Sequence, residues 1–176
     1  VTSQVLPAHF PKGYQGFYCM KYELTQGQYA EFLNMLDATQ AANRYEETHY
    51  WTSQSNGYRY NIIGSHPNKT TTTPDLPAIY VEYHDGAAYS DWAGLRPMTE
   101  LEFEKASRGP LPAVAGEYVW GTATIDETWT PLNNEDTPQE GIAGGYATTV
   151  GNAWYNDTRS TQSVVRVGIY AANALN

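Results

Sequence analysis

The sequence predicts an α+β domain with little regular secondary structure. Two kinds of observation support this class: helical patterns that carry explicit capping residues, and short alternating stretches typical of strands, separated by long Gly-, Pro-, Asn- and Thr-rich connections. We expect a small antiparallel sheet with two or three helices. The chain has 176 residues, enough for one domain with a substantial core, so we expect residues 1–176 to form a single domain.

The first elements are a strand followed directly by a helix. Residues 17–25, FYCMKYELT, alternate around aromatic and apolar positions and predict a strand. Thr25 and Gln28 have the spacing of a capping box, which predicts a helix over residues 25–37. The apolar positions that follow share one helical face: Tyr29, Phe32, Leu33 and Leu36.

Residues 37–77 contain no long periodic segment, and a connection of this length is often functional. Aromatic residues gather in its middle: Tyr45, Tyr50, Trp51, Tyr58 and Tyr60. Rigid aromatic rings provide contact area at low entropic cost, so one interpretation is a surface for a ligand or partner. The other interpretation is that the rings fix a long loop to the core.

The middle of the chain predicts a short strand at residues 78–83 and two helices. One helix covers residues 85–93 and ends at Gly94, a typical C-terminal capping residue. The other covers residues 99–107 and begins with a second capping box, Thr99 and Glu102. Beyond it, the best strand candidates are GEYVWGT at residues 116–122 and VVRVGIY at residues 164–170.

Charge and hydrophobicity argue against a nucleic acid partner and against a membrane span. The net charge of −9 and the pI near 4.8 disfavour contact with a phosphate backbone, so we expect no nucleic acid partner. No run of about 18 apolar residues occurs, so we expect no membrane span. The low Lys content and the many Thr, Asn, Gly and Tyr residues favour a secreted or cell-surface protein.

Four sequence blocks in order are similar to one known family. They are MKYELTQGQYAEFLN, then HDGAAYSDWAG, then RPMTELEFEKASRG, and finally VWG. They resemble the formylglycine-generating enzyme family, also called the sulfatase-modifying factor domain, over residues 17–121. The resemblance implies a variant of the C-type-lectin-like fold, with much ordered loop. It also implies that the capped helices are the framework of the fold and that members differ in the loops.

One departure from that family bears on function. The resemblance implies a cysteine pair that holds copper in the C-terminal third, whereas this chain has a single cysteine, Cys19. We therefore do not expect copper on this chain. We expect Cys19 to be a buried structural thiol in the first strand. We also expect that the family's C-terminal third is missing and that a protein partner or a second chain covers the face left open.

Calcium is the metal that we expect. The resemblance implies a calcium ligand from an Asn in a Gly-Asn segment, which Asn152 matches. Oxygen ligands from loops suit this ion, although Asn and Asp also serve as turn formers. The histidines show no metal-binding spacing; they are His9, His49, His66 and His84.

Two functions from different classes follow. The first is a non-catalytic binding or structural module on this scaffold, secreted or on the cell surface and part of a larger assembly. The alternative is part of a copper-dependent oxidase that converts a protein cysteine to formylglycine. A fold alone does not decide between them.

Overall fold

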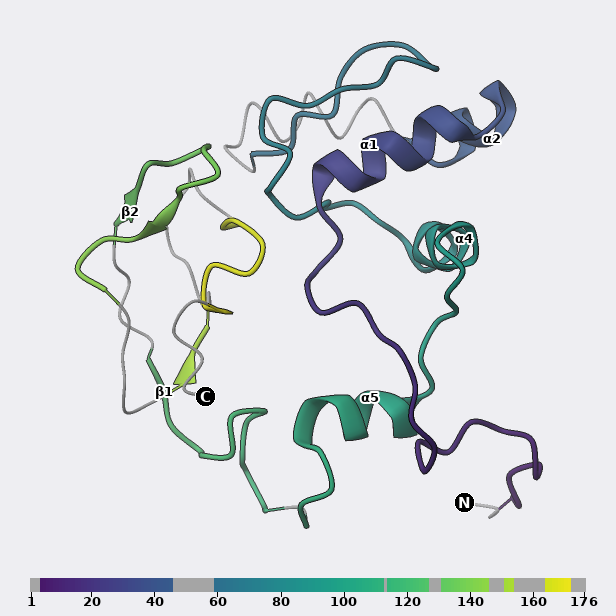
Figure 1. The fold of residues 1–176 in the computed structure, drawn as a ribbon, viewed down its shortest axis with the longest axis vertical. Helices are drawn as coiled ribbons and strands as arrows, with labels where there is room; N and C mark the ends of the chain where they lie inside the picture. The colour runs from purple at the N-terminus through teal and green to yellow at the C-terminus, as the bar shows by residue number, and fades with distance from the viewer. Residues whose placement is uncertain are drawn as a thin grey trace.

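The computed structural model describes residues 4–45, 59–112, 114–126, 131–145, 151–153 and 164–171. Within these residues the chain forms short helices and two-residue strands joined by long loops, which confirms the predicted α+β class (Figure 1). The helices are α1 (Gln26–Met35), α2 (Ala38–Asn43), α4 (Tyr83–Trp92) and α5 (Glu100–Arg108). The strands are β1 (Ile125–Asp126), β2 (Leu132–Asn133), β3 (Gly141–Ile142) and β4 (Gly151–Asn152).

Helix α1 begins where the capping pattern predicts. The Thr25 hydroxyl accepts a hydrogen bond from the Gln28 backbone N–H at 3.2 Å, and the Gln28 side chain accepts one from the Thr25 N–H at 3.1 Å. Each of these bonds satisfies a donor that a helix start would otherwise leave unpaired. The buried face of α1 includes the predicted apolar residues Tyr29, Phe32 and Leu33.

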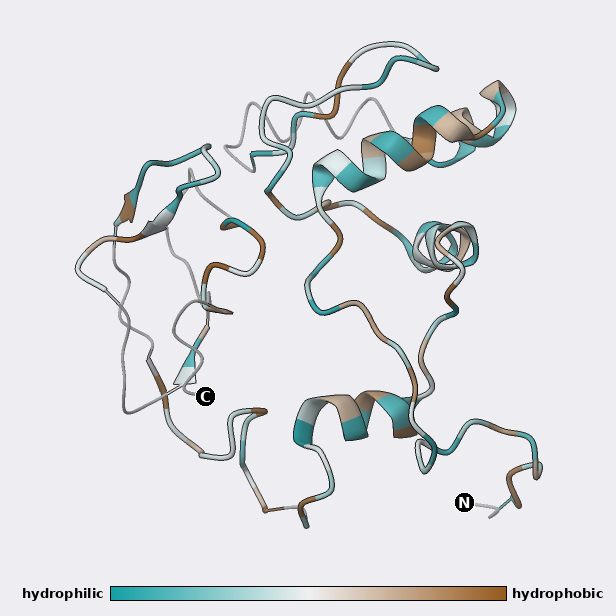
Figure 2. Ribbon diagram, in the orientation of Figure 1, coloured by the Kyte–Doolittle hydropathy of each residue, from teal (hydrophilic) through white to brown (hydrophobic). Residues whose placement is uncertain are grey.

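Helices α1 and α4 enclose the larger of two apolar cores. Phe32, which is 1 % exposed, meets the rings of Tyr89 and Trp92 edge-on at centroid distances of 5.6 Å. Edge-to-face packing of this kind stabilises a core beyond simple area burial. The smaller core is separate and consists of Leu132, Ile142 and Ile169. Figure 2 shows that many hydrophobic residues lie on loops between the helices rather than in strands.

Two helix boundaries differ from the sequence prediction. Helix α2 was not predicted, because its six residues carry too little periodicity; its start is marked only by the Asp37–Gln40 capping box. Helix α4 begins two residues earlier than predicted, because the Asp85 carboxylate accepts a hydrogen bond from the Glu82 N–H at 3.0 Å. The predicted strand at residues 78–83 is wrong, because residues 78–82 form no strand and residue 83 belongs to α4.

The other strand predictions are also wrong in position, although the small antiparallel sheet is confirmed. Residues 17–24 contain no strand, and Thr25 contributes only an isolated bridge to Pro77. Residues 116–122 and 164–170 form turns and loops. The strands lie instead in two separate ladders: β2 pairs antiparallel with β3, and β1 pairs parallel with β4.

Helix α5 joins the N-terminal loop to the rest of the chain. The Thr99 hydroxyl donates to the Pro11 carbonyl at 2.8 Å, and Lys105 Nζ donates to the Gln15 carbonyl at 2.9 Å. Leu101 and Phe103 of this helix are 42 % and 61 % exposed. Among the described residues, none of the helices has the length and apolar character that crossing a membrane requires.

Candidate functional site

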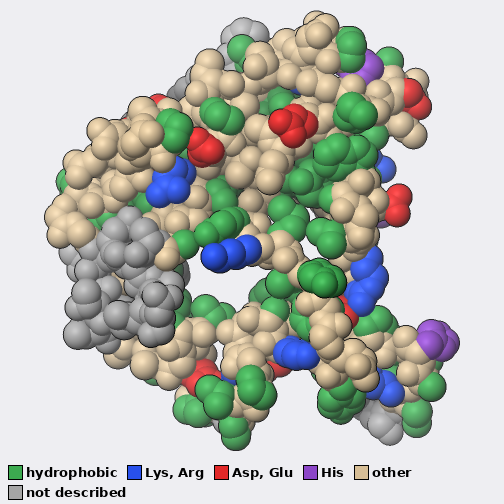
Figure 3. Space-filling view, viewed as in Figure 1, with side chains coloured by type: hydrophobic (Ala, Val, Ile, Leu, Met, Phe, Trp, Pro, Cys, Tyr) green, Lys and Arg blue, Asp and Glu red, His purple; other side chains and the backbone are tan. Residues whose placement is uncertain are grey.

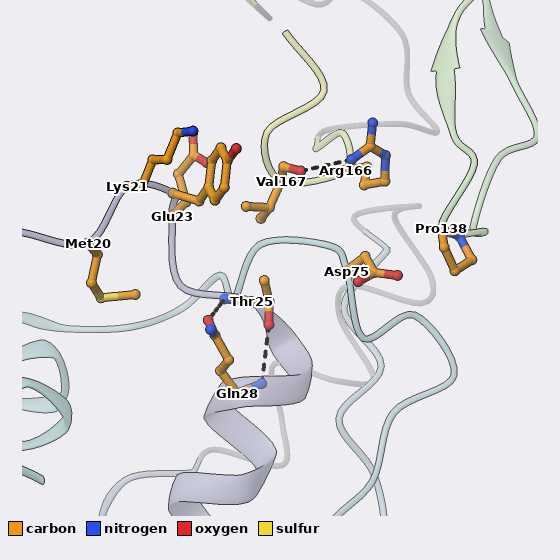
Figure 4. Close-up of a pocket in the computed structure, with 10 residues that line it drawn as sticks. Met20, Lys21, Glu23, Thr25, Gln28, Asp75, Pro138, Arg166 and Val167 are labelled. Atoms are coloured by element: carbon orange, nitrogen blue, oxygen red, sulfur yellow. Dashed lines mark hydrogen bonds between the residues drawn. The ribbon is translucent and has the colours of Figure 1, made fainter. Parts of the chain in front are cut away.

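A cavity of about 420 Å³ lies where four distant parts of the chain meet, one of which contributes Pro138 (Figure 4). Residues 20–25 form one wall, Asp75 belongs to the loop before α4, and Arg166 and Val167 come from the C-terminal segment. Its size falls in the range of small-ligand sites. The space-filling view shows this face of the molecule hollowed near its centre, with basic and hydrophobic side chains at the rim (Figure 3).

Two contacts hold the walls of the cavity together. The Val167 N–H donates to the Asp75 carbonyl at 2.9 Å, which ties the C-terminal segment to the loop. Gly168 has a φ of +69°, and a Cβ at this position would lie 3.0 Å from the Tyr22 ring. The backbone at residue 168 therefore approaches the ring as closely as glycine allows.

A buried carboxylate fixes Arg166 from behind. Glu140, which is 1 % exposed, accepts a hydrogen bond from the Arg166 backbone N–H at 2.7 Å through Oε1. The Glu140 carbonyl accepts another from Arg166 Nε at 2.9 Å. These bonds fix both the backbone and the guanidinium of Arg166. The cation therefore has a defined position at the cavity.

Arg59 neutralises the charge of that carboxylate. Its guanidinium forms an ion pair with Glu140 and a second one with Asp136, whose Oδ1 lies 2.8 Å from Nη2. Burial alone would lower the pKa of Arg59, but the bonds to Glu140 and Asp136 raise it above its ordinary value. Because a buried ion left without its partner is strongly destabilising, this pair acts as one structural unit.

The N-terminus of α1 faces the cavity, with Thr25 and Gln28 in its lining (Figure 4). Free backbone N–H groups at a helix start are a common anion site. Here the donors are already used: Gln26 N–H bonds to the Leu76 carbonyl at 2.8 Å and Gly27 N–H to the Pro74 carbonyl at 3.1 Å. The chemistry of the cavity therefore rests on its side chains rather than on the helix end.

The charged lining comprises two cations and two anions, namely Lys21, Arg166, Glu23 and Asp75. Apolar groups complete it, including Met20, Tyr22, Pro138 and Val167. No thiol or imidazole is among the lining residues that the structure describes. This set suits the binding of a polar ligand.

The predicted aromatic set falls partly outside the described residues, where Tyr50, Trp51 and Tyr58 lie. Tyr60 is 3 % exposed and meets Tyr80 edge-on at 5.8 Å. The Tyr45 hydroxyl donates to the Ile62 carbonyl at 2.6 Å, and Lys69 Nζ lies 3.2 Å from the Tyr45 ring centroid. Tyr60 belongs to the larger core and Tyr45 packs against it, whereas the role of the aromatic set as a binding surface stays a prediction.

The structure places Asn152 in β4, where the parallel ladder pairs it with Asp126 of β1. The neighbouring Gly151 lies against the Trp120 ring so closely that any Cβ would overlap it. This close contact with the Trp120 ring explains why residue 151 is a glycine. Within the described residues, no group of three or more His, Cys, Asp or Glu side chains is arranged to hold a metal ion. The calcium ligand at Asn152 stays a prediction.

The prediction that Cys19 is buried is wrong. Its side chain is exposed, because residues 17–24 form no strand that would pack the thiol against a sheet. Of the histidines, His49 lies outside the described residues, and His66 Nε2 makes a hydrogen bond to the Leu36 carbonyl at 2.9 Å. His84 lies within α4.

A second groove, of about 490 Å³, lies between the N-terminal loop and the start of α5. Arg96 closes it with a two-bond ion pair to Glu102, at 2.7 and 2.8 Å. The Arg96 bond lowers the pKa of Glu102 to about 2. These two residues belong to the block that the sequence analysis interprets as framework, and their mutual neutralisation agrees with that role.

An α+β domain of capped helices and long ordered loops is the class that this structure defines. The family described as the Sulfatase-modifying factor enzyme 1-like domain matches residues 3–175, and the chain therefore belongs to this family. The resemblance inferred from the four sequence blocks is confirmed.

Several curated proteins are similar to parts of the chain. A formylglycine-generating enzyme of Bos taurus is 32 % identical over 114 residues, which are 51 % of this chain and 29 % of that protein. A hercynine oxygenase of Mycobacterium tuberculosis is 37 % identical over 62 residues, 35 % of this chain and 15 % of that protein. The inactive C-alpha-formylglycine-generating enzyme 2 of Mus musculus is 43 % identical over 47 residues, which are 27 % of this chain and 15 % of that protein.

The aligned part of the chain spans less than a third of the length of each of these relatives. No solved structure matches the chain with significance.

Proposed function

We propose that this chain is a non-catalytic binding or structural module on the sulfatase-modifying-factor scaffold, secreted or at the cell surface and part of a larger assembly. One observation carries the proposal: the 176 residues contain a single thiol, Cys19. Soft thiolates select copper(I), and the oxidase chemistry that the family resemblance implies needs a pair of them. One thiolate cannot supply that pair.

The position of Cys19 supports the same conclusion. Its side chain is exposed, and it is not among the residues that line the cavity. The cavity presents charged, polar and apolar side chains and no thiol. Such a surface suits recognition better than covalent chemistry.

Exposed apolar side chains support a role in an assembly. Around α5 and the loop that follows it, Phe103, Leu111 and Val119 are 61 %, 70 % and 64 % exposed. Exposed apolar surface of this kind commonly marks a protein contact. The curated relatives are longer than this chain, so we propose that a partner chain or a further segment covers this surface.

The alternative is that the chain forms part of a copper-dependent oxidase that converts a protein cysteine to formylglycine. The names of several relatives favour it, since formylglycine-generating enzymes of Bos taurus and Streptomyces coelicolor are among them. In that case the thiolates that hold copper come from polypeptide outside these 176 residues. The relative from Mus musculus that is named inactive fits the first proposal instead.

Calcium is the cofactor that we propose. Asn152 would contribute an amide oxygen, and Asp126 occupies the paired position of the neighbouring strand. The role proposed for the ion is to stabilise the short β1–β4 ladder, in which each strand has two residues.

Copper(I) affinity tests the proposal. The protein competes with the copper(I) chelator bathocuproine disulfonate, and Cys19→Ser serves as the matched variant. We expect both proteins to leave the chelator complex intact to the same extent. One equivalent of copper(I) withdrawn from the chelator by the native protein, and not by Cys19→Ser, would contradict the proposal, because it would show that Cys19 itself holds copper.

A further inference from the structure

The charged side chains in the cavity make few contacts with described residues, although Lys21 Nζ lies 5.2 Å from the centroid of the Tyr22 ring. Lys21, Glu23 and Asp75 make no ion pair and no side-chain hydrogen bond there. The Arg166 guanidinium donates only to two backbone carbonyls, those of Glu140 at 2.9 Å and Val167 at 3.2 Å. A guanidinium has five N–H donors, so most of them remain available at the cavity.

The backbone along one wall is also unpaired. Residues 17–23 make no backbone hydrogen bond to any described residue, and residues 20–23 of this segment line the cavity. Figure 1 shows the segment descending from α1 towards α5 with no strand beside it. Unpaired N–H and C=O groups of this kind pair readily with another extended chain.

We infer that the cavity binds a short peptide with both ends charged. Its carboxylate bonds to Arg166, its ammonium group lies against Asp75, and its amide groups pair with the backbone of residues 20–23. Met20 and Val167 provide apolar contacts for its side chains. Figure 4 shows Lys21 and Glu23 on one side of the view and Arg166 and Asp75 on the other, with Val167 between them.

The balance of charge favours a zwitterion over an ion. The lining carries two cationic and two anionic side chains, whereas the whole chain carries a net charge of −9. A net negative field repels a simple anion, and the Arg166 and Lys21 cations oppose a simple cation. A zwitterionic peptide is neutral overall and satisfies both signs locally. This inference names the ligand class of the proposed binding role and rests on it.

Isothermal titration with the tripeptide Ala-Ala-Ala tests the inference. We expect binding by the native protein, and an affinity about tenfold weaker for the C-terminal amide and for the N-acetylated peptide, because each loses one charge-assisted contact. Arg166→Gln should weaken the binding of Ala-Ala-Ala by a similar factor and abolish the difference in affinity between the free acid and the C-terminal amide. Asp75→Asn should abolish the difference in affinity between the free and the N-acetylated peptide.

Lys12→Gln is the matched control, because Lys12 lies in the other groove and makes no ion pair with a described residue. It should bind all three peptides as the native protein does. The peptide series in the native protein keeps the test decisive even where a variant at Arg166 folds poorly. Absence of heat with Ala-Ala-Ala up to ~10 mM, or equal affinity for the amide and the free acid, would overturn the inference. Copper binding tests the non-catalytic role separately, so the two can fail independently.

Discussion

Replacing Gln26 by Met probes the polar network that positions the cavity wall. Gln26 is fully buried at the first position of α1. Its Nε2 donates to the Arg59 carbonyl at 2.9 Å, and its Oε1 accepts from the Asn61 N–H at 3.0 Å. The side chain therefore ties α1 to the segment that carries the buried cation Arg59. Methionine has a similar length but can form neither bond.

The expected cost follows from the two backbone groups left without partners. A buried polar group without a hydrogen bond costs about 1–3 kcal/mol, so two cost about 2–6 kcal/mol. Burial of the more apolar methionine returns about 1 kcal/mol. The net loss of unfolding free energy is therefore about 3 kcal/mol, a large part of the 5–15 kcal/mol typical of a domain.

Urea unfolding measures this loss, and Gln28→Met is the matched control. Gln28 is the same residue type two positions later, but it is exposed and contributes only to the helix cap. Its replacement should cost about 0.5–1 kcal/mol. The comparison uses the midpoint at an unchanged denaturant slope. If the two variants lose the same stability, the network around Gln26 does not hold the wall and the reasoning is wrong.

Three further predictions concern other parts of the structure. The Arg96 bond lowers the pKa of Glu102 from 4.5 to about 2, so its contribution to stability is present above about pH 4.5 and is lost as the pH falls towards 2; Glu102→Gln should flatten the stability–pH curve in that window. Removing calcium with EDTA should lower the melting temperature of the native protein but not of Asn152→Ala, since an ion bound only to the native state stabilises it. Equal changes of melting temperature in the two proteins would contradict a calcium site at Asn152. Gly151→Ala should destabilise by about 1–3 kcal/mol in urea, because its Cβ overlaps the Trp120 ring. Gly16→Ala provides the comparison, since a Cβ at residue 16 has no atom within 4 Å.

The helices were predictable because their signals are local. Capping boxes at Thr25 and Thr99 depend on residues three positions apart, and the structure confirms both. Gly94 ends α4 with a φ of +72°, as its position after the helix predicts. The family was predictable for the same reason, since the blocks around these helices keep their order and spacing.

The strands were not predictable because pairing depends on partners that are distant in the sequence. Residues 17–23 alternate as a strand does, yet no described residue makes a backbone hydrogen bond to them. The ladders that do form have two residues in each strand, too few for any pattern to appear. The exposure of Cys19 follows directly from the unpaired segment.

The cavity was likewise beyond the sequence, because residues 20–25, 75 and 166–167 come together only through tertiary bonds. Gln26 illustrates the point. It lies between the two predicted members of the capping box, Thr25 and Gln28, and no local pattern separates its buried role from the exposed role of Gln28. A signal was available only for Arg59 and Arg166, as rare basic residues in an acidic chain.

Turnover of a cysteine-containing sulfatase-type peptide tests the proposed non-catalytic role most directly. The 176-residue protein is loaded with copper(I) under air, and mass spectrometry follows conversion of the peptide cysteine to formylglycine. We predict that the peptide mass stays unchanged, and equally so with Cys19→Ser. Copper-dependent formation of the aldehyde that disappears in Cys19→Ser would contradict the account and show an oxidase that works with a single cysteine.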